Sequence, residues 1–191
     1  MSAPLLLERL IGCFAYFIPG GTLVDALTVS ATVKPDIVPL DNWTAYNLGS
    51  ILTYRHVPEI EDNSFKKASP SGGWEKAIRK KVVSDALLLK TREMGEPQLR
   101  LEFGLLSAIV EGTAQSPFAN TARQIDGWLK VHYRQEDGTD MSLMDMWCTM
   151  ELVNGLTAEG KTAEPELSFT HIKSVGGVAV AGNTIVFPVA A

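Results

Sequence analysis

Apolar and polar residues alternate with a period of two along much of this chain, a pattern typical of β-strands with one buried face. Residues 82–93 alternate in this way, and so do residues 125–135 and 141–152. An Asp137-Gly138 step lies between the last two runs, and such a step between alternating runs predicts a β-hairpin. Shorter runs of strand-like composition cover residues 28–38, 43–61, 166–175 and 184–188. The pattern therefore predicts about six to eight strands.

One segment has a helical period instead. Its apolar residues recur every three or four positions, at Leu99, Phe103, Leu106 and Val110. With Pro97 in the first turn, where proline is tolerated, they predict an amphipathic helix over about residues 97–110. Because strands do not alternate with helices along the chain, a doubly wound parallel sheet is excluded. The sequence predicts a mainly β fold, an antiparallel sandwich or barrel with one flanking helix.

Residues 62–81 differ in composition from the runs on either side. They are polar, basic and rich in turn-forming residues, with Phe65 and Trp74 embedded among them. We expect a long hairpin loop here, and loops longer than about 12–15 residues inside compact domains are usually functional or disordered. Within them, Lys76, Arg79, Lys80 and Lys81 form a basic run. They favour a solvated loop, or one that pairs with acidic groups on a neighbouring subunit.

Composition narrows the class of protein. The chain has 191 residues, of which 46% are hydrophobic and 20% charged, too apolar for a disordered protein. Lys and Arg number 17 against 22 Asp and Glu, a net charge of −5. This acidic excess argues against a protein that grips nucleic acid by its phosphates. At this length we expect one domain over residues 1–191.

Apolar residues gather near both termini. Glu8 and Arg9 interrupt the first run and leave about nine apolar residues, against roughly 20 that span a bilayer. No basic segment precedes the run, so we expect neither a signal peptide nor membrane insertion. We interpret residues 1–27 as an N-terminal arm and residues 176–191 as a C-terminal segment. Both need cover from the core or from a partner.

The motifs in the sequence give no indication of catalysis. The three histidines lie on predicted strands: His56, His132 and His171. A G-x-S-x-G elbow is missing from the sequence. Cys13 and Cys148 stand outside any CxxC or Cys/His cluster, which favours two reduced, buried thiols over a zinc site. We expect no enzyme activity, no cofactor and no bound metal. A cluster of large apolar residues lies within residues 141–150: Met141, Met144, Met146, Trp147 and Met150. We interpret it as part of a strand core and an interface rather than as an adaptable binding surface.

Several stretches together resemble the major tail tube proteins of tailed bacteriophages, in particular the siphophage-like family. They are residues 63–65 (NSF), 69–75 (SPSGGWE), 91–97 (TREMGEP), 111–118 (EGTAQSPF), 125–130 (IDGWLK) and 143–148 (LMDMWC). None of them is a catalytic signature, and their order and spacing carry the resemblance. It runs from about residue 42 to residue 187, which is most of the chain.

The resemblance implies a single tail-tube domain and a structural role in the virion. In that family, subunits form hexameric rings that stack into a hollow tail tube, through which phage DNA is delivered without specific binding. The implied partners are further copies of the chain, the tape measure protein, the tail terminator and baseplate or tip proteins. The implied localisation is the phage tail, after assembly in the cytoplasm of the bacterial host.

Residue roles follow from this architecture as hypotheses. Candidate inter-subunit contacts are Phe65, Trp74, Lys76, Arg79 and Lys80. Candidate acidic residues of the lumen, where negative charge lets DNA slide, are Glu136, Asp137, Asp140 and Asp145. We also expect the hairpin at residues 125–152 to extend sheets between neighbouring subunits.

Two alternatives stay open. The first is a β-barrel carrier or enzyme that binds a small apolar ligand, with the methionine and tryptophan cluster and the helix as a lid. It predicts a monomer or dimer that co-purifies with its ligand. The second keeps the tube but changes its owner to a type VI secretion system, a tailocin or a gene-transfer particle. Both tube hypotheses predict hollow tubes in negative-stain images.

Overall fold

The computed structural model describes residues 10–35, 43, 45–135, 140–155, 164–172 and 183–186. Within these residues the protein consists mainly of antiparallel β-strands, with one α-helix. Six strands build the body: β1 Leu10–Pro19, β4 Asn47–Ala68, β5 Trp74–Thr91, β6 Gln124–Gln135, β7 Asp140–Asn154 and β8 Glu166–His171. Three are short: β2 Leu23–Val24, β3 Leu27–Thr28 and β9 Thr184–Val186. The predicted fold class is confirmed.

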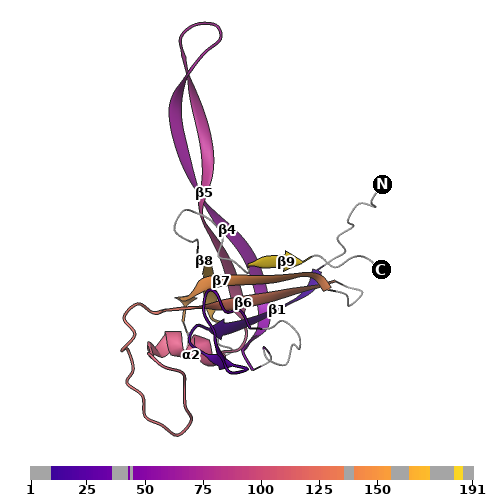
Figure 1. The fold of residues 1–191 in the computed structure, drawn as a ribbon, viewed down its shortest axis with the longest axis vertical. Coiled ribbons are helices and arrows are strands. Elements are labelled where there is room, and N and C mark those ends of the chain that lie inside the picture. The colour runs from indigo at the N-terminus through magenta and orange to yellow at the C-terminus, as the bar shows by residue number, and fades with distance from the viewer. Residues whose placement is uncertain are drawn as a thin grey trace.

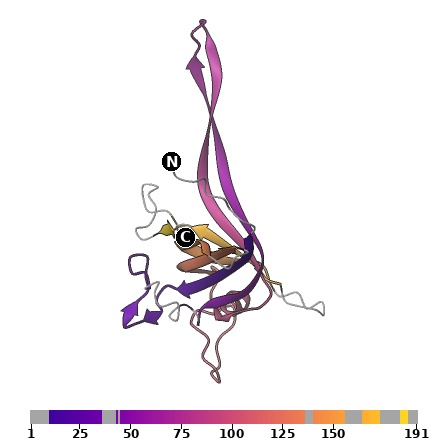
Figure 2. The ribbon, with the colours of Figure 1, turned by 90° about the vertical axis from the view of Figure 1, so that its right-hand side faces the viewer.

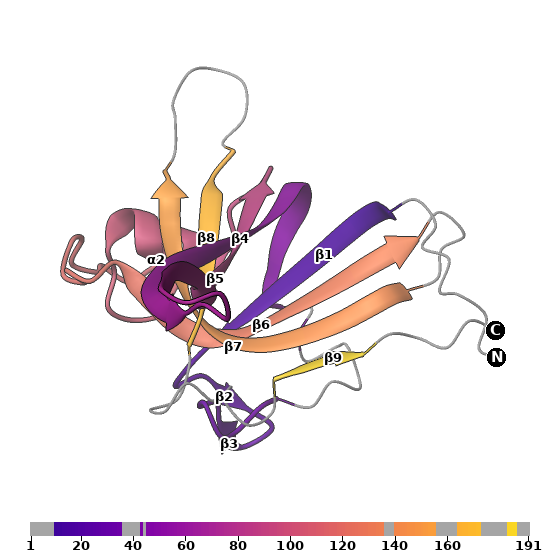
Figure 3. The ribbon, with the colours of Figure 1, turned by 90° about the horizontal axis from the view of Figure 1, so that it is seen from above.

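The six body strands form a closed barrel. Hydrogen-bonded neighbours follow the order β6-β1-β4-β5-β8-β7, and β7 also pairs with β6. Figure 3 shows the two crossing layers of this barrel, with β1, β6 and β7 running together across β4, β5 and β8. β9 adds to the edge of β7, where Leu143 lies opposite Val186. It is the part of the predicted C-terminal segment, residues 176–191, that forms a strand in the described part of the chain.

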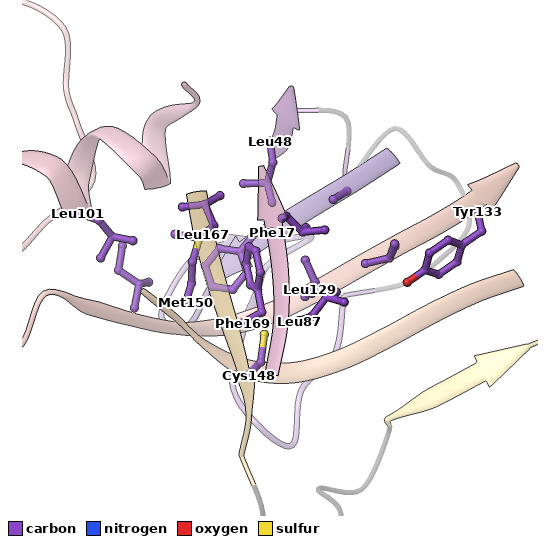
Figure 4. Packing of buried hydrophobic residues seen from close by; sticks show 14 residues of the cluster. Phe17, Leu48, Leu87, Leu101, Leu129, Tyr133, Cys148, Met150, Leu167 and Phe169 are labelled. Carbon is purple, nitrogen blue, oxygen red and sulfur yellow. The ribbon is translucent and has the colours of Figure 1, made fainter. Parts of the chain in front are cut away.

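Side chains from alternate strand positions fill the barrel interior. On β6 the odd-numbered residues point inward, since Ile125, Leu129 and Val131 are buried in one cluster. Figure 4 shows this cluster, in which the rings of Phe17 and Phe169 lie 5.7 Å apart between centroids. Each fully buried apolar side chain of this kind contributes about 1.5–3 kcal/mol. The interior is therefore a packed core.

A second apolar cluster covers the outer face of β1, β6 and β7. Trp128 packs edge-on against Trp147, with 5.6 Å between ring centroids. The Trp128 indole Nε1 donates a hydrogen bond of 2.8 Å to the Ser30 carbonyl, which ties residues 20–35 to the barrel. Because Met150 belongs to the interior cluster and Trp147 to the outer one, the predicted place of these residues in the strand core is confirmed.

The N-terminal prediction is corrected by β1. Residues 1–27 were expected to form an arm, but β1 lies in the barrel and pairs with β6 along its length. Residues 15–19 of β1 are covered on both faces, one by the interior and one by the outer cluster, so their apolar run shows no alternation. Of the strand expected at residues 28–38, the described part, residues 28–35, contains the end of β3 and a single bridge between Ser30 and Val33. Residues 1–9 lie outside the described part.

The helix, α2, covers Glu96–Phe103 and ends well before the predicted limit at residue 110. Gly104 follows it in the left-handed conformation, with φ of 57°, where glycine has no Cβ penalty. The predicted apolar stripe is therefore wrong beyond this point. Leu106 and Val110 lie in the following loop and are exposed.

Two buried residues fix α2 on the barrel. Leu101 belongs to the interior cluster. Gln98 is fully buried, and its Nε2 donates a hydrogen bond of 3.0 Å to the Leu48 carbonyl near the start of β4. The Gln98 Oε1 accepts from the Gly95 N–H, which satisfies one of the free donors at the start of the helix. Among the described residues, no helix is long and apolar enough to cross a membrane.

Candidate assembly surface

β4 and β5 continue far beyond the barrel as a two-stranded antiparallel ribbon. β8 pairs with β5 only as far as Ala86, and β1 pairs with β4 only near Ser50. Within the described residues, residues 58–85 therefore pair only with each other, and we call them the arm. Figures 1 and 2 show the arm projecting from the body. About eleven residues per strand, at about 3.3 Å each, give it a length of roughly 35 Å.

The chain reverses at the tip of the arm in residues 69–73. Gly72 and Gly73 have φ of 85° and 102°, values that favour glycine. The Gly72 N–H donates to the Ser69 carbonyl at 3.0 Å, and the Ser69 N–H donates to the Gly73 carbonyl at 3.0 Å. The prediction of a loop over residues 62–81 is thus wrong in extent. The ribbon buries neither face on the barrel, so its sequence lacks the clean alternation that identifies a strand.

Cross-strand pairing sorts the arm side chains onto two faces, because directly opposite residues point the same way. One face, called the Trp74 face, collects the pairs Ile60 with Val82, Asp62 with Lys80, Ser64 with Ile78, Lys66 with Lys76 and Ala68 with Trp74. Of the predicted contact residues, Trp74, Lys76 and Lys80 therefore lie together. Phe65 and Arg79 share the other face, where the guanidinium carbon lies 5.1 Å from the ring centroid.

Apolar side chains on the arm are exposed to solvent. Trp74 is 74% exposed and Ile78 is 56% exposed, and Ile60, Phe65 and Val82 are exposed as well. A two-stranded hairpin alone is marginally stable in water, and a monomer rarely leaves such a surface uncovered. The sequence prediction missed Ile60, Ile78 and Val82, whose common face only the pairing register reveals.

Charge separates the outer part of the arm, residues 62–81, from the rest of the chain. Residues 62–81 contain six basic and two acidic residues, a net charge of +4. Because the whole chain carries −5, the remaining residues carry −9. Opposite potentials on two parts of the same molecule steer the arm of one copy toward the body of another.

Long free strand edges run along the arm. We expected the hairpin at residues 125–152 to extend sheets between subunits, and the structure corrects this. β6 is bordered by β1, and the outer edge of β7 is shared by β8 and β9. By contrast, the arm strands lack a second neighbour in the described part, and unpaired edges are templates for another chain.

The four predicted lumen residues fall in different settings. Glu136 and Asp137 lie outside the described residues, and only the backbone of Asp140 is described. Asp145 is 3% exposed, and its carboxylate lies 3.2 Å from the Lys34 ammonium and 3.7 Å from that of Lys130. In the single chain its charge is therefore compensated inside the outer cluster. The lumen role stays a prediction for the first three residues.

The three histidines lie in different parts of the structure and have different contacts. The His56 Nε2 lies 3.2 Å from the Asp85 Oδ1 at the base of the arm, and both residues are exposed or half-buried. His132 is buried in β6, and His171 at the end of β8 contacts the Asn183 amide at 2.7 Å. No group of three or more metal-ligating side chains gathers within the described residues.

Both cysteines are free thiols. Cys148 is buried, and Cys13 is half-buried. Burial raises the pKa of Cys13 to about 12 and also raises the pKa of Cys148. Since the thiolate is the nucleophile, these shifts keep both cysteines unreactive near neutral pH.

Comparison with known proteins gave two findings. No family model matches the chain, and no curated protein matches it. Among solved structures, a chain of the cryo-EM structure of the anti-feeding prophage cap, a tube-terminating cap, is similar with a TM-score of 0.43 and 9% identity, covering 98% of this chain and 96% of that chain. A chain of the six-fold symmetrised baseplate of the same particle has a TM-score of 0.38 and 9% identity, covering 98% of both chains. At such TM-scores and identities the likeness decides nothing about this chain's function.

Proposed function

We propose that this protein is a structural subunit of a phage tail or tail-like particle, and that stacked rings of it form a hollow tube for the passage of DNA. The observation that carries the proposal is the arm, a ribbon with exposed apolar residues and a basic outer part, residues 62–81, beside a net acidic body. The sequence resemblance to tail tube proteins points to the same role. No catalytic function is assigned to the chain.

Self-association gives the arm a partner surface. Covering one large apolar side chain contributes about 1.5–3 kcal/mol, and the Trp74 face alone offers four exposed large side chains, Ile60, Trp74, Ile78 and Val82. A contact between the arm of one copy and the body of the next joins two different patches. Such heterologous contacts form rings when the rotation closes and filaments when it does not. A tube of stacked rings needs both kinds of contact, one that closes each ring and one that stacks the rings without closing.

Charge is consistent with passage of DNA. With six subunits in a ring, as the resemblance implies, chains of −5 give a ring of −30. If the basic outer parts of the arms are engaged between subunits, the remaining surface is more acidic still, and a polyanion slides past it without binding. Glu136, Asp137 and Asp140 are the proposed lumen carboxylates. The proposed partners are the tape measure, terminator and baseplate or tip proteins, the site of assembly is the host cytoplasm, and the final location is the virion tail.

The test is assembly of the purified chain, observed by negative-stain electron microscopy. In the main variant, residues 61–81 are replaced by Asn-Gly. Ile60 and Val82 are directly opposite each other, so a two-residue turn can join them without changing the barrel. We expect tubes from the natural chain, and a folded, cooperatively unfolding variant that forms none.

Leu23→Ser is the matched control, because Leu23 is an exposed apolar residue on β2, away from the arm. It is expected to assemble normally. A natural chain that stays monomeric at high concentration would refute the tube. Tubes of normal length from the shortened variant would instead remove the arm from the assembly contact.

The alternative of a small-ligand carrier meets a structural obstacle. The barrel interior is filled by its own side chains. A cavity of about 410 Å³ lies outside the barrel, lined by residues that include Val24, Val29 and Lys34. Native mass spectrometry of a monomer carrying a ligand would favour the carrier over the tube.

A further inference from the structure

The loop between α2 and β6, residues 104–123, has no regular secondary structure but is held by hydrogen bonds. The Phe118 N–H donates to the Phe103 carbonyl at 2.7 Å, so the loop closes back onto the end of the helix. The Gln115 side chain crosses the loop and donates to the Ala108 carbonyl at 2.7 Å. The loop is therefore a compact structure of the kind that often carries function.

This loop and the last residue of α2, Phe103, present apolar side chains outward. Phe103, Leu106, Val110 and Phe118 are exposed, and Leu106 leaves 69% of its surface in solvent. The Arg123 guanidinium carbon lies 5.3 Å from the Phe118 ring and shields part of one ring only. Like the arm, the loop gathers large apolar side chains that are exposed to solvent.

Carboxylates surround this end of the barrel. They occur in residues 90–126, 151–155 and 164–166, which build α2, its loop and the adjoining strand ends. These stretches contain eight acidic residues: Glu93, Glu96, Glu102, Glu111, Asp126, Glu151, Glu164 and Glu166. They contain four basic residues: Lys90, Arg92, Arg100 and Arg123. The net charge is −4, opposite to the +4 of residues 62–81.

The loop and the arm tip lie at opposite ends of the molecule. β5 starts at Trp74 beside the tip and ends at Thr91, where Lys90 pairs with Glu166 at the start of β8. Figures 1 and 2 show α2 and its loop at one end and the arm at the other. A chain therefore cannot place its own arm tip on its own loop.

We propose that the exposed side chains of Phe103, Leu106, Val110 and Phe118, with the carboxylates around them, form an acceptor surface for the arm of a second copy of this chain. The Trp74 face supplies apolar residues to meet the loop and ammonium groups to meet the carboxylates. The contact is head-to-tail and leaves a free arm and a free acceptor at its two ends, so it repeats. This inference rests on the proposed function and specifies where the arm docks.

Charge exchange tests the pairing. The arm variant is Lys76→Glu with Lys80→Glu, and the acceptor variant is Glu111→Lys with Glu151→Lys. Because like charges then face each other, each is expected to raise the concentration needed for assembly by about tenfold or more. The chain that carries all four substitutions is expected to assemble again within about threefold of the natural concentration. Added salt is expected to weaken the natural contact, since these charges are exposed.

The control is Asp25→Lys, which adds the same kind of charge on the β2–β3 hairpin outside both surfaces and is expected to leave assembly unchanged. Circular dichroism confirms that each variant is folded. If both double variants fail and the fourfold variant fails as well, the acceptor surface is wrong. If the shortened-arm variant also fails in that case, the arm still mediates assembly at another site. Absence of tubes from the natural chain would overturn the tube and this inference together.

Discussion

The substitution Asp145→Asn tests whether the Asp145 carboxylate stabilises the fold or serves as a charge in the lumen of the tube. Its carboxylate lies 3.2 Å from the Lys34 ammonium and 3.7 Å from that of Lys130, and the Lys130 side chain is fully buried. At an effective dielectric constant of about 20, each contact has a gross attraction of about 5 kcal/mol. Desolvation offsets much of this, but removing one partner of a buried ion pair typically costs about 3–5 kcal/mol.

We therefore expect Asp145→Asn to lower the free energy of unfolding by about 3 kcal/mol, since asparagine keeps the shape and loses the charge. With a urea slope of about 2 kcal/mol per molar, the midpoint falls by about 1.5 M. Tryptophan fluorescence is the readout, because Trp128 and Trp147 lie in the same outer cluster. Glu151→Gln is the matched control on β7, and its exposed side chain predicts a change within about 0.5 kcal/mol.

A second variant separates the charge from the packing. Lys130→Met with Asp145→Leu replaces the buried pair by apolar side chains and is expected to cost less than Asp145→Asn alone, since such replacements are often neutral or stabilising. Equal midpoints for Asp145→Asn and Glu151→Gln would show that the burial of Asp145 is not a source of stability. The carboxylate would then return to the set of candidates for the lumen.

Two further predictions concern the barrel. Gly127→Ala is expected to destabilise by about 2–3 kcal/mol in urea unfolding, because an added Cβ would lie 2.4 Å from the Ile18 carbonyl oxygen and 2.6 Å from the Phe17 ring. Gly12→Ala on β1 is its control, because its Cβ would lie at an ordinary 3.6 Å from the Phe14 ring, and equal losses for both would refute the argument. Alkylation of native Cys13 by iodoacetamide at pH 9 is expected to be at least about 100-fold slower than in the unfolded chain, since burial raises its pKa to about 12, and to accelerate only toward that pH. Equal rates at pH 9, measured by mass spectrometry, would contradict the burial of this thiol.

The sequence alone determined the class of fold. Period-two alternation identified β6 and β7, because the two faces of each strand have different surroundings and the residue types alternate accordingly. Helical spacing with Pro97 in the first turn placed the start of α2 within one residue of Glu96. Periodicity failed for the helix end, where Gly104 and the returning loop decide the boundary, and for β1, where residues 15–19 are covered on both faces and leave no alternation to read.

The candidate site was predicted in part. Phe65, Trp74 and the basic residues of 62–81 were recognised by composition, which is local information. Their division between two faces depends on which residue lies opposite which, as when Ala68 meets Trp74, and that follows from the register of two distant strands. The burial of Asp145 likewise depends on Lys34, which is 111 positions away in the chain.

The sequence by itself determined which kinds of segment the chain contains: strands with alternating residues, a basic segment with aromatic residues, and a remaining chain with net negative charge. What only the tertiary structure decided is their placement. A closed barrel occupies the edges of β6 and β7 and leaves those of the arm free. It also puts the basic tip and the acidic loop at opposite ends. The physical reason is that charge and apolar character belong to residues, whereas exposure and direction arise only when strands distant in sequence pair.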